Sequence, residues 1–226
     1  MVKTIYDDMV NNTVHYGHRT QKWDPRMKKY LYGERNGVHV FNLEMTVKML
    51  EEACAFLSKN VAEGKTVLFV STKPQAIALI EESAKACGMP FVVSRWIPGF
   101  LTNFPTVKTR IDYLKSLKEQ EANGEFEKYT KKEASQLKKT IEKLETSLGG
   151  VQNLTKKPDV VFVADVVKDE IVVKEAKVMK VPVVGICDSN ANPTQVDYPI
   201  PGNDDAVKSL KFLIGKVLEA VQSARK

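Results

Sequence analysis

The sequence predicts an α/β protein with a doubly wound parallel sheet and an inserted helical hairpin. Residues 66–93 and 159–187 repeat one pattern, in which a short, continuous apolar strand is followed by a helix and a second apolar strand. Strands without alternation are buried on both faces, and helices between them indicate right-handed βαβ crossovers. Residues 107–148, between the two repeats, are rich in Lys, Glu and Leu and show no strand pattern. We therefore expect helices on both faces of one sheet and a hairpin projecting from it.

The N-terminal part predicts a helix, an irregular segment, a strand and a second helix. Residues 3–12 have the spacing of an amphipathic helix with Met9 facing inward. Residues 38–41 predict a brief strand, and Asn42 is expected to cap a helix that ends near Ala62.

The first βαβ unit consists of a strand at 66–70, a helix from Pro74 to Cys87, a stop at Gly88 and a strand at 90–93. The two strands and the helix between them have the lengths expected of a single βαβ crossover.

The second unit has strands at 159–165 and 182–187 joined by a helix over about 170–179. A last helix is expected over about 204–223 with Asn203 as its N-cap, so that two aspartates in its first turn oppose the positive helix end. The loop before it is dense in Asn, Asp and Pro, which turns and caps explain without chemistry.

The middle segment predicts two antiparallel helices with a turn at 122–126. Apolar residues spaced four and three apart form a narrow seam on each helix: Val107, Ile111 and Leu114 on the first, and Leu137, Ile141, Leu144 and Leu148 on the second. We assign residues 105–150 to this hairpin, and residues 1–104 and 151–226 to the α/β domain. Lysines give the second helix a partly basic face, although a solvated surface laced by i,i+4 pairs explains them equally well.

Composition sets only broad limits. Of the 226 residues 43% are apolar and 27% charged, and the net charge of +6 suits a polyanionic partner but also many soluble enzymes. The cysteines Cys54, Cys87 and Cys187 are far apart and are expected to be buried thiols in a reducing cytoplasm. The start lacks the pattern of a secretory signal and no apolar run has the length of a membrane span. We expect a cytoplasmic protein with no membrane partner.

Residues 15–37 form a basic-aromatic segment, which is predicted to be an ordered loop. It contains six cations and two anions, interleaved with four aromatic residues, and its glycines and Pro25 prevent a long helix. Cations neutralise phosphates, and aromatic or guanidinium planes stack on unpaired bases. The pattern fits a binder of folded RNA, and it also fits a solvated loop pinned by buried rings.

A catalytic site would be expected beyond the carboxyl ends of the strands, where ligands of parallel sheets bind. Thr72 and Lys73 open a helix and could hold a phosphate, but we favour a simple cap with Pro74 at the first helical position. Asp165 and Asp188 could hold Mg²⁺, yet paired acids at one strand end are missing. No dinucleotide or phosphate-loop fingerprint is present, and we expect no metal, cofactor or small-molecule substrate.

Four blocks of the sequence resemble one family. HYGHRTQKWDPRMKKYLYGERNGVHVFNLEMT (15–46), SRWIPGFLTNFPTV (94–107), PDVVFVAD and CDSNANPTQVDYPIPGNDDA (187–206) are similar to the small-subunit ribosomal protein S-two family of the bacterial and organellar type. The likeness covers essentially the whole chain in the same order.

The resemblance implies a flavodoxin-like fold with a protruding coiled-coil hairpin and no enzymatic activity. It implies a structural constituent of the small ribosomal subunit that contacts rRNA and helps to join head and body. Neighbouring ribosomal proteins are its implied partners, among them ribosomal protein S-one where that protein exists. The family occurs in cytoplasmic and organellar ribosomes. The alternative from another class is a phosphate-handling α/β enzyme or phosphotransfer domain. A third option is a coiled-coil adaptor, in which the hairpin binds protein and the basic loop is incidental.

The resemblance also implies a set of RNA-facing residues: Arg19, Lys22, Trp23, Arg26, Lys28, Lys29, Arg35, Arg95, Trp96, Lys108, Arg110, Lys131, Lys132, Lys138 and Lys139. Two residues depart from the usual family pattern, since Pro98 and Ser71 each replace a glycine, and the segment after Asp165 is also atypical. Proline fixes φ and removes an N–H, so the turn at Pro98 must differ from the family's or already require φ near about −65°.

Overall fold

The computed structural model describes residues 2–225, with side chains described from residue 5 onward. The helices are α1 (Val2–Asn11), α2 (Leu43–Ala62), α3 (Pro74–Ala86), α4 (Phe104–Ala122), α5 (Lys131–Leu148), α6 (Glu170–Val178) and α7 (Val207–Ala224). The strands are β1 (Tyr16–Arg19), β2 (Leu31–Arg35), β3 (Val38–Phe41), β4 (Val67–Val70), β5 (Phe91–Val92), β6 (Val160–Val163), β7 (Val183–Cys187) and β8 (Tyr198–Pro201).

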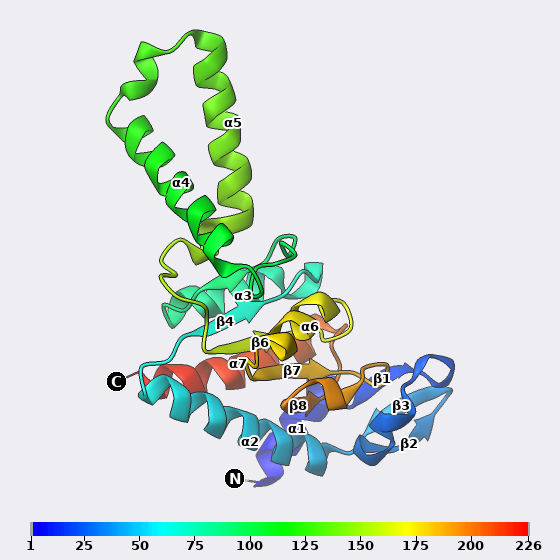
Figure 1. Ribbon diagram of the computed structural model, residues 1–226. Coiled ribbons are helices and arrows are strands. Elements are labelled where there is room, and N and C mark those ends of the chain that lie inside the picture. The colour runs from blue at the N-terminus through cyan, green and yellow to red at the C-terminus, as the bar shows by residue number, and fades with distance from the viewer. Residues whose placement is uncertain (1, 226) are drawn as a thin grey trace.

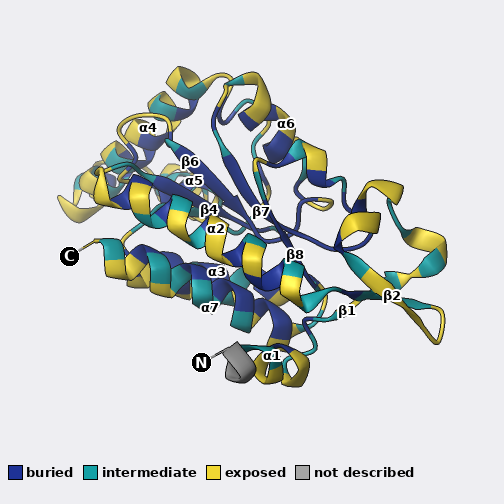
Figure 2. Cartoon of the chain, turned by 90° about the horizontal axis from the view of Figure 1, so that it is seen from below, coloured by how far each residue is buried: buried dark blue, intermediate teal, exposed yellow. Residues whose placement is uncertain are grey.

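A five-stranded parallel sheet forms the centre of the molecule, in the order β5-β4-β6-β7-β8. Every residue of β4, β6 and β7 is buried, as continuous apolar strands require. Figure 2 shows these strands in dark blue between the helices. Both βαβ predictions are confirmed, although β5 is shorter than expected.

β8 was not predicted, because its sequence YPIP contains two prolines. Proline cannot donate to a strand ladder and is tolerated at the edge of a sheet, and β8 is an edge strand. The strand pairs with β7 through Ile200 opposite Ile186.

The two faces of the sheet are covered differently. α2, α3 and α7 pack on one face around Phe69 and Phe162. The opposite face is covered by α6, by the loop over 96–101, by the base of the hairpin and by buried residues of the N-terminal segment. The predicted fold class, an α/β protein with helices on both faces, is confirmed.

The prediction for the start of the last helix was wrong. α7 begins at Val207 with Ala206 as its N-cap, and the Asn203 side chain instead accepts hydrogen bonds from the N–H groups of Asp205 and Ala206. Asp204 therefore lies before the helix and is buried. The sequence favoured Asn203 as the cap because a polar side chain precedes an acidic pair, but this side chain caps the turn before the helix and not the helix itself.

α4 and α5 form the expected antiparallel hairpin, which projects from the sheet (Figure 1). Thr130 and Glu133 form a capping box at the start of α5. Of the predicted seam, Val107, Ile111, Leu114, Ile141 and Leu148 are buried, and Leu137 and Leu144 pack against them. The buried seam is continuous with the apolar cluster on the α6 face of the sheet, so the hairpin and the α/β domain share one core. The division of the chain into two domains therefore stays a prediction.

No helix among residues 2–225 has the length and apolar character that crossing a bilayer requires.

Candidate nucleic-acid interface

Residues 15–41, which we call the β-module, are more regular than the loop that the sequence predicted. β1, β3 and β2 form a small antiparallel sheet in that order, and the short 3₁₀-helix Pro25–Tyr30 lies between β1 and β2. β2 and β3 are joined by Asn36 and Gly37, which have φ of 54° and 73°. Two residues with positive φ are typical of a tight hairpin turn, and the Asn-Gly dipeptide was the sequence signal that could have revealed it.

Three side chains of the β-module are buried in the body. Met27, Tyr30 and Phe41 belong to the apolar cluster on the α6 side of the sheet. The 3₁₀-helix that carries the first two begins with an Asp24 cap and Pro25 at its first position. The module is thus held by apolar burial on one side and is free to expose its charges on the other.

Hydrogen bonds fix the β-module to the end of β7. The backbone N–H of His18 donates to Ser189 Oγ and that of Asp24 donates to the Ser189 carbonyl, both at 2.8 Å. Gly17 lies so close that a Cβ there would be 2.8 Å from Ser189 Oγ. Any larger residue would force Ser189 or the strand to shift, and the attachment joins residues far apart in the sequence.

The predicted cations of the β-module are all on its surface. Exposed side chains are those of Arg19, Lys22, Arg26, Lys28, Lys29 and Arg35. Arg26 forms an ion pair with Asp24 at 2.8 Å, and the others have no ion pair recorded within residues 5–225. Trp23 is half-buried, with its ring centroid 5.0 Å from that of His39. Tyr32, one of the four aromatic residues counted in this segment, is 83% exposed on β2 and adds an open aromatic plane to the module.

The second group of predicted residues lies at the base of the hairpin. Arg95 and Arg110 are exposed, and Lys108 is half-buried with its Nζ 2.7 Å from Asp112. Pro98 and Gly99 occupy the two central positions of a turn in which the N–H of Phe100 donates to the Ile97 carbonyl. Because Gly99 has φ of 90°, this is a type II turn, in which proline is favoured at the first central position. The proline is therefore compatible with the turn.

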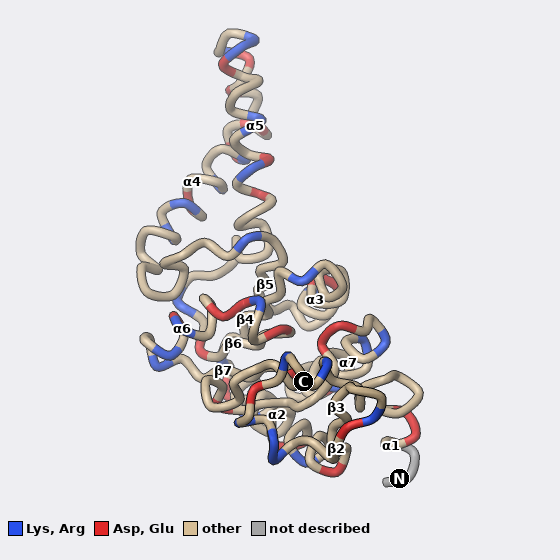
Figure 3. Tube along the Cα trace, turned by 90° about the vertical axis from the view of Figure 1, so that its right-hand side faces the viewer, with Lys and Arg blue, Asp and Glu red and all other residues tan. Residues whose placement is uncertain are grey.

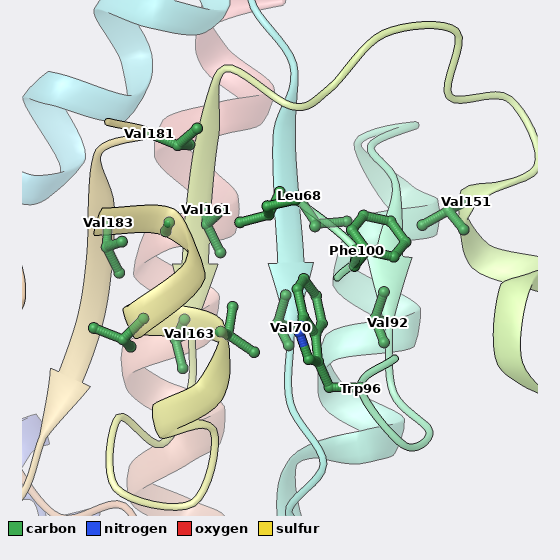
Figure 4. Close-up of a cluster of buried hydrophobic side chains, with 14 of the residues drawn as sticks. Leu68, Val70, Val92, Trp96, Phe100, Val151, Val161, Val163, Val181 and Val183 are labelled. Carbon is green, nitrogen blue, oxygen red and sulfur yellow. The ribbon is translucent and has the colours of Figure 1, made fainter. Parts of the chain in front are cut away.

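Trp96 was wrongly placed among the RNA-facing residues. It is 5% exposed and packs beside Phe100 against Val70 and Val92, as Figure 4 shows. Its indole N–H donates to Glu175 Oε1 at 3.1 Å. The sequence shows a basic residue followed by an aromatic one, but it does not show that this ring has a buried partner on α6.

Glu175 holds the whole loop over 96–102. Besides the indole, its carboxylate accepts hydrogen bonds from the N–H groups of Gly99, Leu101 and Thr102 and from the Thr102 hydroxyl. Burial opposes ionisation, but the hydrogen bonds from the Gly99 amide and the Trp96 indole outweigh it and lower the pKa of Glu175. This acid was not singled out from the sequence, because nothing local distinguishes it from a surface glutamate.

The hairpin lysines form the third group. Lys131, Lys132, Lys138 and Lys139 are exposed on α5. Lys138 lies 3.6 Å from Glu121 on α4, and Figure 3 shows positive and negative segments alternating along α5. The hairpin surface is therefore less uniformly positive than that of the β-module.

A polar cluster lies beyond the carboxyl ends of the strands, at the place where an enzyme of this fold class would bind its ligand. The ammonium group of Lys73 is 3.0 Å from Asp165 and 2.7 Å from both Asp204 and Asp205. Burial alone would lower the pKa of Lys73, but the Asp204 carboxylate raises it, so the lysine is charged. Three carboxylates around one ammonium leave no positive charge for a phosphate, and this disfavours the phosphate-handling alternative.

His18 connects this cluster to the β-module. Its Nδ1 is 3.0 Å from Asp188, and the hydrogen bond to Asp188 raises the pKa of the imidazole despite partial burial. Burial, together with the charges of Asp188 and Asp165, raises the pKa of Asp204 to about 7. Ligand atoms of His18, Asp188 and Asp204 lie within 4.8 Å of one another, a donor set that could hold a divalent cation. The sequence placed Asp165 and Asp188 at strand ends, but nothing in it indicated that His18 lies beside Asp188.

The fold and the surface together define a class of protein: an α/β scaffold that displays exposed cations on an anchored module and carries a projecting helical hairpin. The chain belongs to the family described as Ribosomal protein S2, whose model matches residues 9–224. It is similar to the small ribosomal subunit protein uS2 of Dehalococcoides mccartyi (strain CBDB1), with 45% identity over 225 residues that cover 100% of this chain and 92% of the relative. It is also 45% identical, over 221 residues, to the small ribosomal subunit protein uS2 of Dictyoglomus thermophilum, covering 98% of this chain and 90% of the relative. The resemblance identified from the sequence blocks is confirmed.

Proposed function

We propose that this chain is a structural constituent of the small ribosomal subunit, which binds small-subunit rRNA through the β-module and helps to join head and body during translation. The family assignment supports the place in the subunit. The observation that carries the rRNA contact is the β-module itself, where six exposed cations are held on a surface fixed to the body by buried side chains.

Binding follows from electrostatics and shape. Cations that are already in position neutralise phosphates and release counterions without the entropy cost of ordering a flexible loop. Trp23, packed against His39, braces this surface. Because a charged surface of this kind reads backbone geometry, we expect recognition of a folded RNA shape more than of a base sequence.

Two further groups extend the proposed surface. Arg95, Lys108 and Arg110 lie at the hairpin base, and the α5 lysines lie along the hairpin. Trp96 is left out because it is buried. We include neighbouring subunit proteins as partners, with ribosomal protein S-one among them where that protein exists.

The test replaces Arg19, Lys22, Arg26 and Lys28 by alanine. These side chains are exposed, so the fold is expected to remain intact while incorporation into small subunits, measured by sedimentation, falls strongly. The dependence of rRNA affinity on salt should weaken as well, by about 3 to 4 in the slope of log K against log salt, because four phosphate contacts are lost.

A matched control removes the same charge elsewhere. Lys48, Lys59, Lys208 and Lys211 are exposed on α2 and α7 and have no recorded ion pair within residues 5–225. Their replacement by alanine is expected to leave incorporation nearly unchanged. Equal losses in both variants would mean that only the net charge of the protein matters, and not the position of the cations on the β-module. Normal incorporation of the first variant would refute the proposal.

A further inference from the structure

The outer side of α6 exposes aliphatic side chains that the rRNA proposal does not use. Ile171 is 52% and Val178 72% exposed, and Val167, in the turn before the helix, is 44% exposed. Ile171 and Val178 are seven residues apart, so they lie on the same side of the helix. We call these three residues, with the lysines around them, the α6 patch.

Exposed aliphatic residues gather here and not elsewhere. Within residues 5–225 the other large aliphatic side chains of comparable exposure are Val10 and Val207, which lie singly on α1 and at the start of α7. Single exposed apolar residues are ordinary on a protein surface, whereas several exposed on one short helix and the turn before it indicate a candidate interaction site.

The inner side of α6 holds the patch rigidly. Val172, Val173 and Ala176 are buried against the sheet, and Glu175 is bound to the loop over 96–102. α6 has 9 residues, compared with 20 in α2 and 18 in α7 on the opposite face. The α6 side of the sheet therefore carries a short, firmly seated helix whose outer side is not covered by another element of this chain.

The charges around the patch are positive. Lys168, Lys177 and Lys180 are exposed and have no recorded ion pair within residues 5–225, whereas Lys174 lies 2.8 Å from Glu170. An apolar centre with a charged margin is the usual anatomy of a protein–protein interface. A partner whose charge complements these lysines therefore carries Asp or Glu around its own apolar residues.

RNA is a poorer fit to the same surface. Residues 167–180 contain neither arginine nor an aromatic residue. Aromatic rings stack on bases, and arginine binds phosphates through two parallel hydrogen bonds. Aliphatic groups gain by leaving water for an apolar surface, which a phosphate backbone does not offer.

We propose that the α6 patch docks another protein of the small ribosomal subunit, through a surface with apolar residues at its centre and Asp or Glu at its margin. This proposal rests on the proposed function in one respect, which is that the partner is a protein of the same ribosomal subunit.

Photo-crosslinking in assembled subunits tests the contact. Benzoylphenylalanine replaces Val178 in one full-length chain and Val207 in a control chain, since both positions expose a valine on a helix. Position 178 is expected to crosslink to one subunit protein, within a peptide that carries apolar residues beside Asp or Glu. Crosslinking to rRNA alone, or no more crosslinking than from position 207, overturns the proposal.

A pair of double variants then measures the contact. Ile171→Lys with Val178→Lys is expected to weaken retention of the crosslinked protein by at least about tenfold, because two apolar side chains lose their burial. Val10→Lys with Val207→Lys introduces the same charges and should leave retention unchanged. Retention is followed by mass spectrometry of salt-washed subunits, and equal retention in all variants overturns the proposal.

The two proposals fail in different ways. If the unaltered chain does not enter small subunits at all, the proposed function is wrong. If it enters normally and the α6 variants neither crosslink nor lose a protein, only the docking surface is wrong.

Discussion

The β-module and the helical hairpin both carry cations away from the sheet, but they are held in place differently. The β-module inserts Met27, Tyr30 and Phe41 into the body and binds Ser189 through backbone hydrogen bonds. The hairpin instead packs one helix on the other, and ion pairs such as Lys118 with Glu145 join its two helices. Anchors far apart in sequence make the position of the first surface depend on the whole fold, whereas the hairpin is joined to the body only at its base and is otherwise held by pairing between its own helices.

This difference has a consequence for binding. The backbone that carries the cations of the β-module is anchored before any partner arrives, so binding a phosphate costs side-chain entropy but not the entropy of ordering a loop. Cations of the hairpin are partly engaged with carboxylates, and surface pairs of this kind contribute little to stability. We therefore expect the β-module to determine the affinity for rRNA and the hairpin to extend the contact surface.

The largest effect is expected from Glu175→Gln, which weakens the connection between the hairpin base and the body. Several buried N–H groups lose their charged acceptor at once, so the free energy of unfolding should fall by about 3–5 kcal/mol. Denaturant unfolding measures the change, and Glu170→Gln, on the exposed side of α6, is the matched control. A loss of less than about 1 kcal/mol would show that the loop over 96–102 is held by packing alone.

The same variant gives a pH signature. Hydrogen bonds outweigh burial and lower the pKa of Glu175 below its usual 4.5, so its contribution is present above that pH and is lost as the pH falls through the lower folded-state value. The stability difference between the native chain and Glu175→Gln should thus be constant near neutral pH and shrink below about pH 4.5. A difference that grew on acidification would contradict an ionised Glu175.

The second prediction tests whether the hairpin depends on its own seam. Leu114 is fully buried on α4, and its replacement by alanine should cost about 3 kcal/mol through lost burial and a cavity. Hydrogen exchange should accelerate in residues 104–148 and stay unchanged in the β-module. Acceleration in both regions would erase the distinction and argue against a separate hairpin domain.

The third prediction tests the attachment of the β-module. Gly17→Ala places a methyl group 2.8 Å from Ser189 Oγ and should destabilise the module by about 1–3 kcal/mol. Faster exchange of the His18 and Asp24 amide protons is the expected measurement. Gly33→Ala is the control, because a Cβ there meets no atom within 4 Å, and similar effects of both substitutions would refute the close-contact explanation.

The smallest effect is expected from Lys138→Ala. Its partner Glu121 is 3.6 Å away on an exposed surface, so stability should change by less than about 0.5 kcal/mol. Thermal unfolding would detect a larger loss, which would mean that ion pairs, and not the apolar seam, hold the two helices together.

Local signals predicted some parts of the site better than others. Exposed cations of the β-module were identified correctly as surface residues because charge alone keeps Arg19 and Lys22 in water. Trp96 was misjudged, since an aromatic ring next to an arginine fits a surface and a core equally well. β8 was missed because proline argues against a strand unless the strand is known to be at an edge.

The sequence by itself determined most elements of the α/β domain and the hairpin: the central buried strands from continuous apolar runs, the helices from their periodicity, and the hairpin from its two seams. Tertiary structure alone decided which polar groups meet, bringing Lys73 to Asp204, His18 to Asp188 and Glu175 to the loop over 96–102. The physical reason is that periodicity reports which side of an element is buried, whereas partners across more than seventy residues are set by the order in which strands pair.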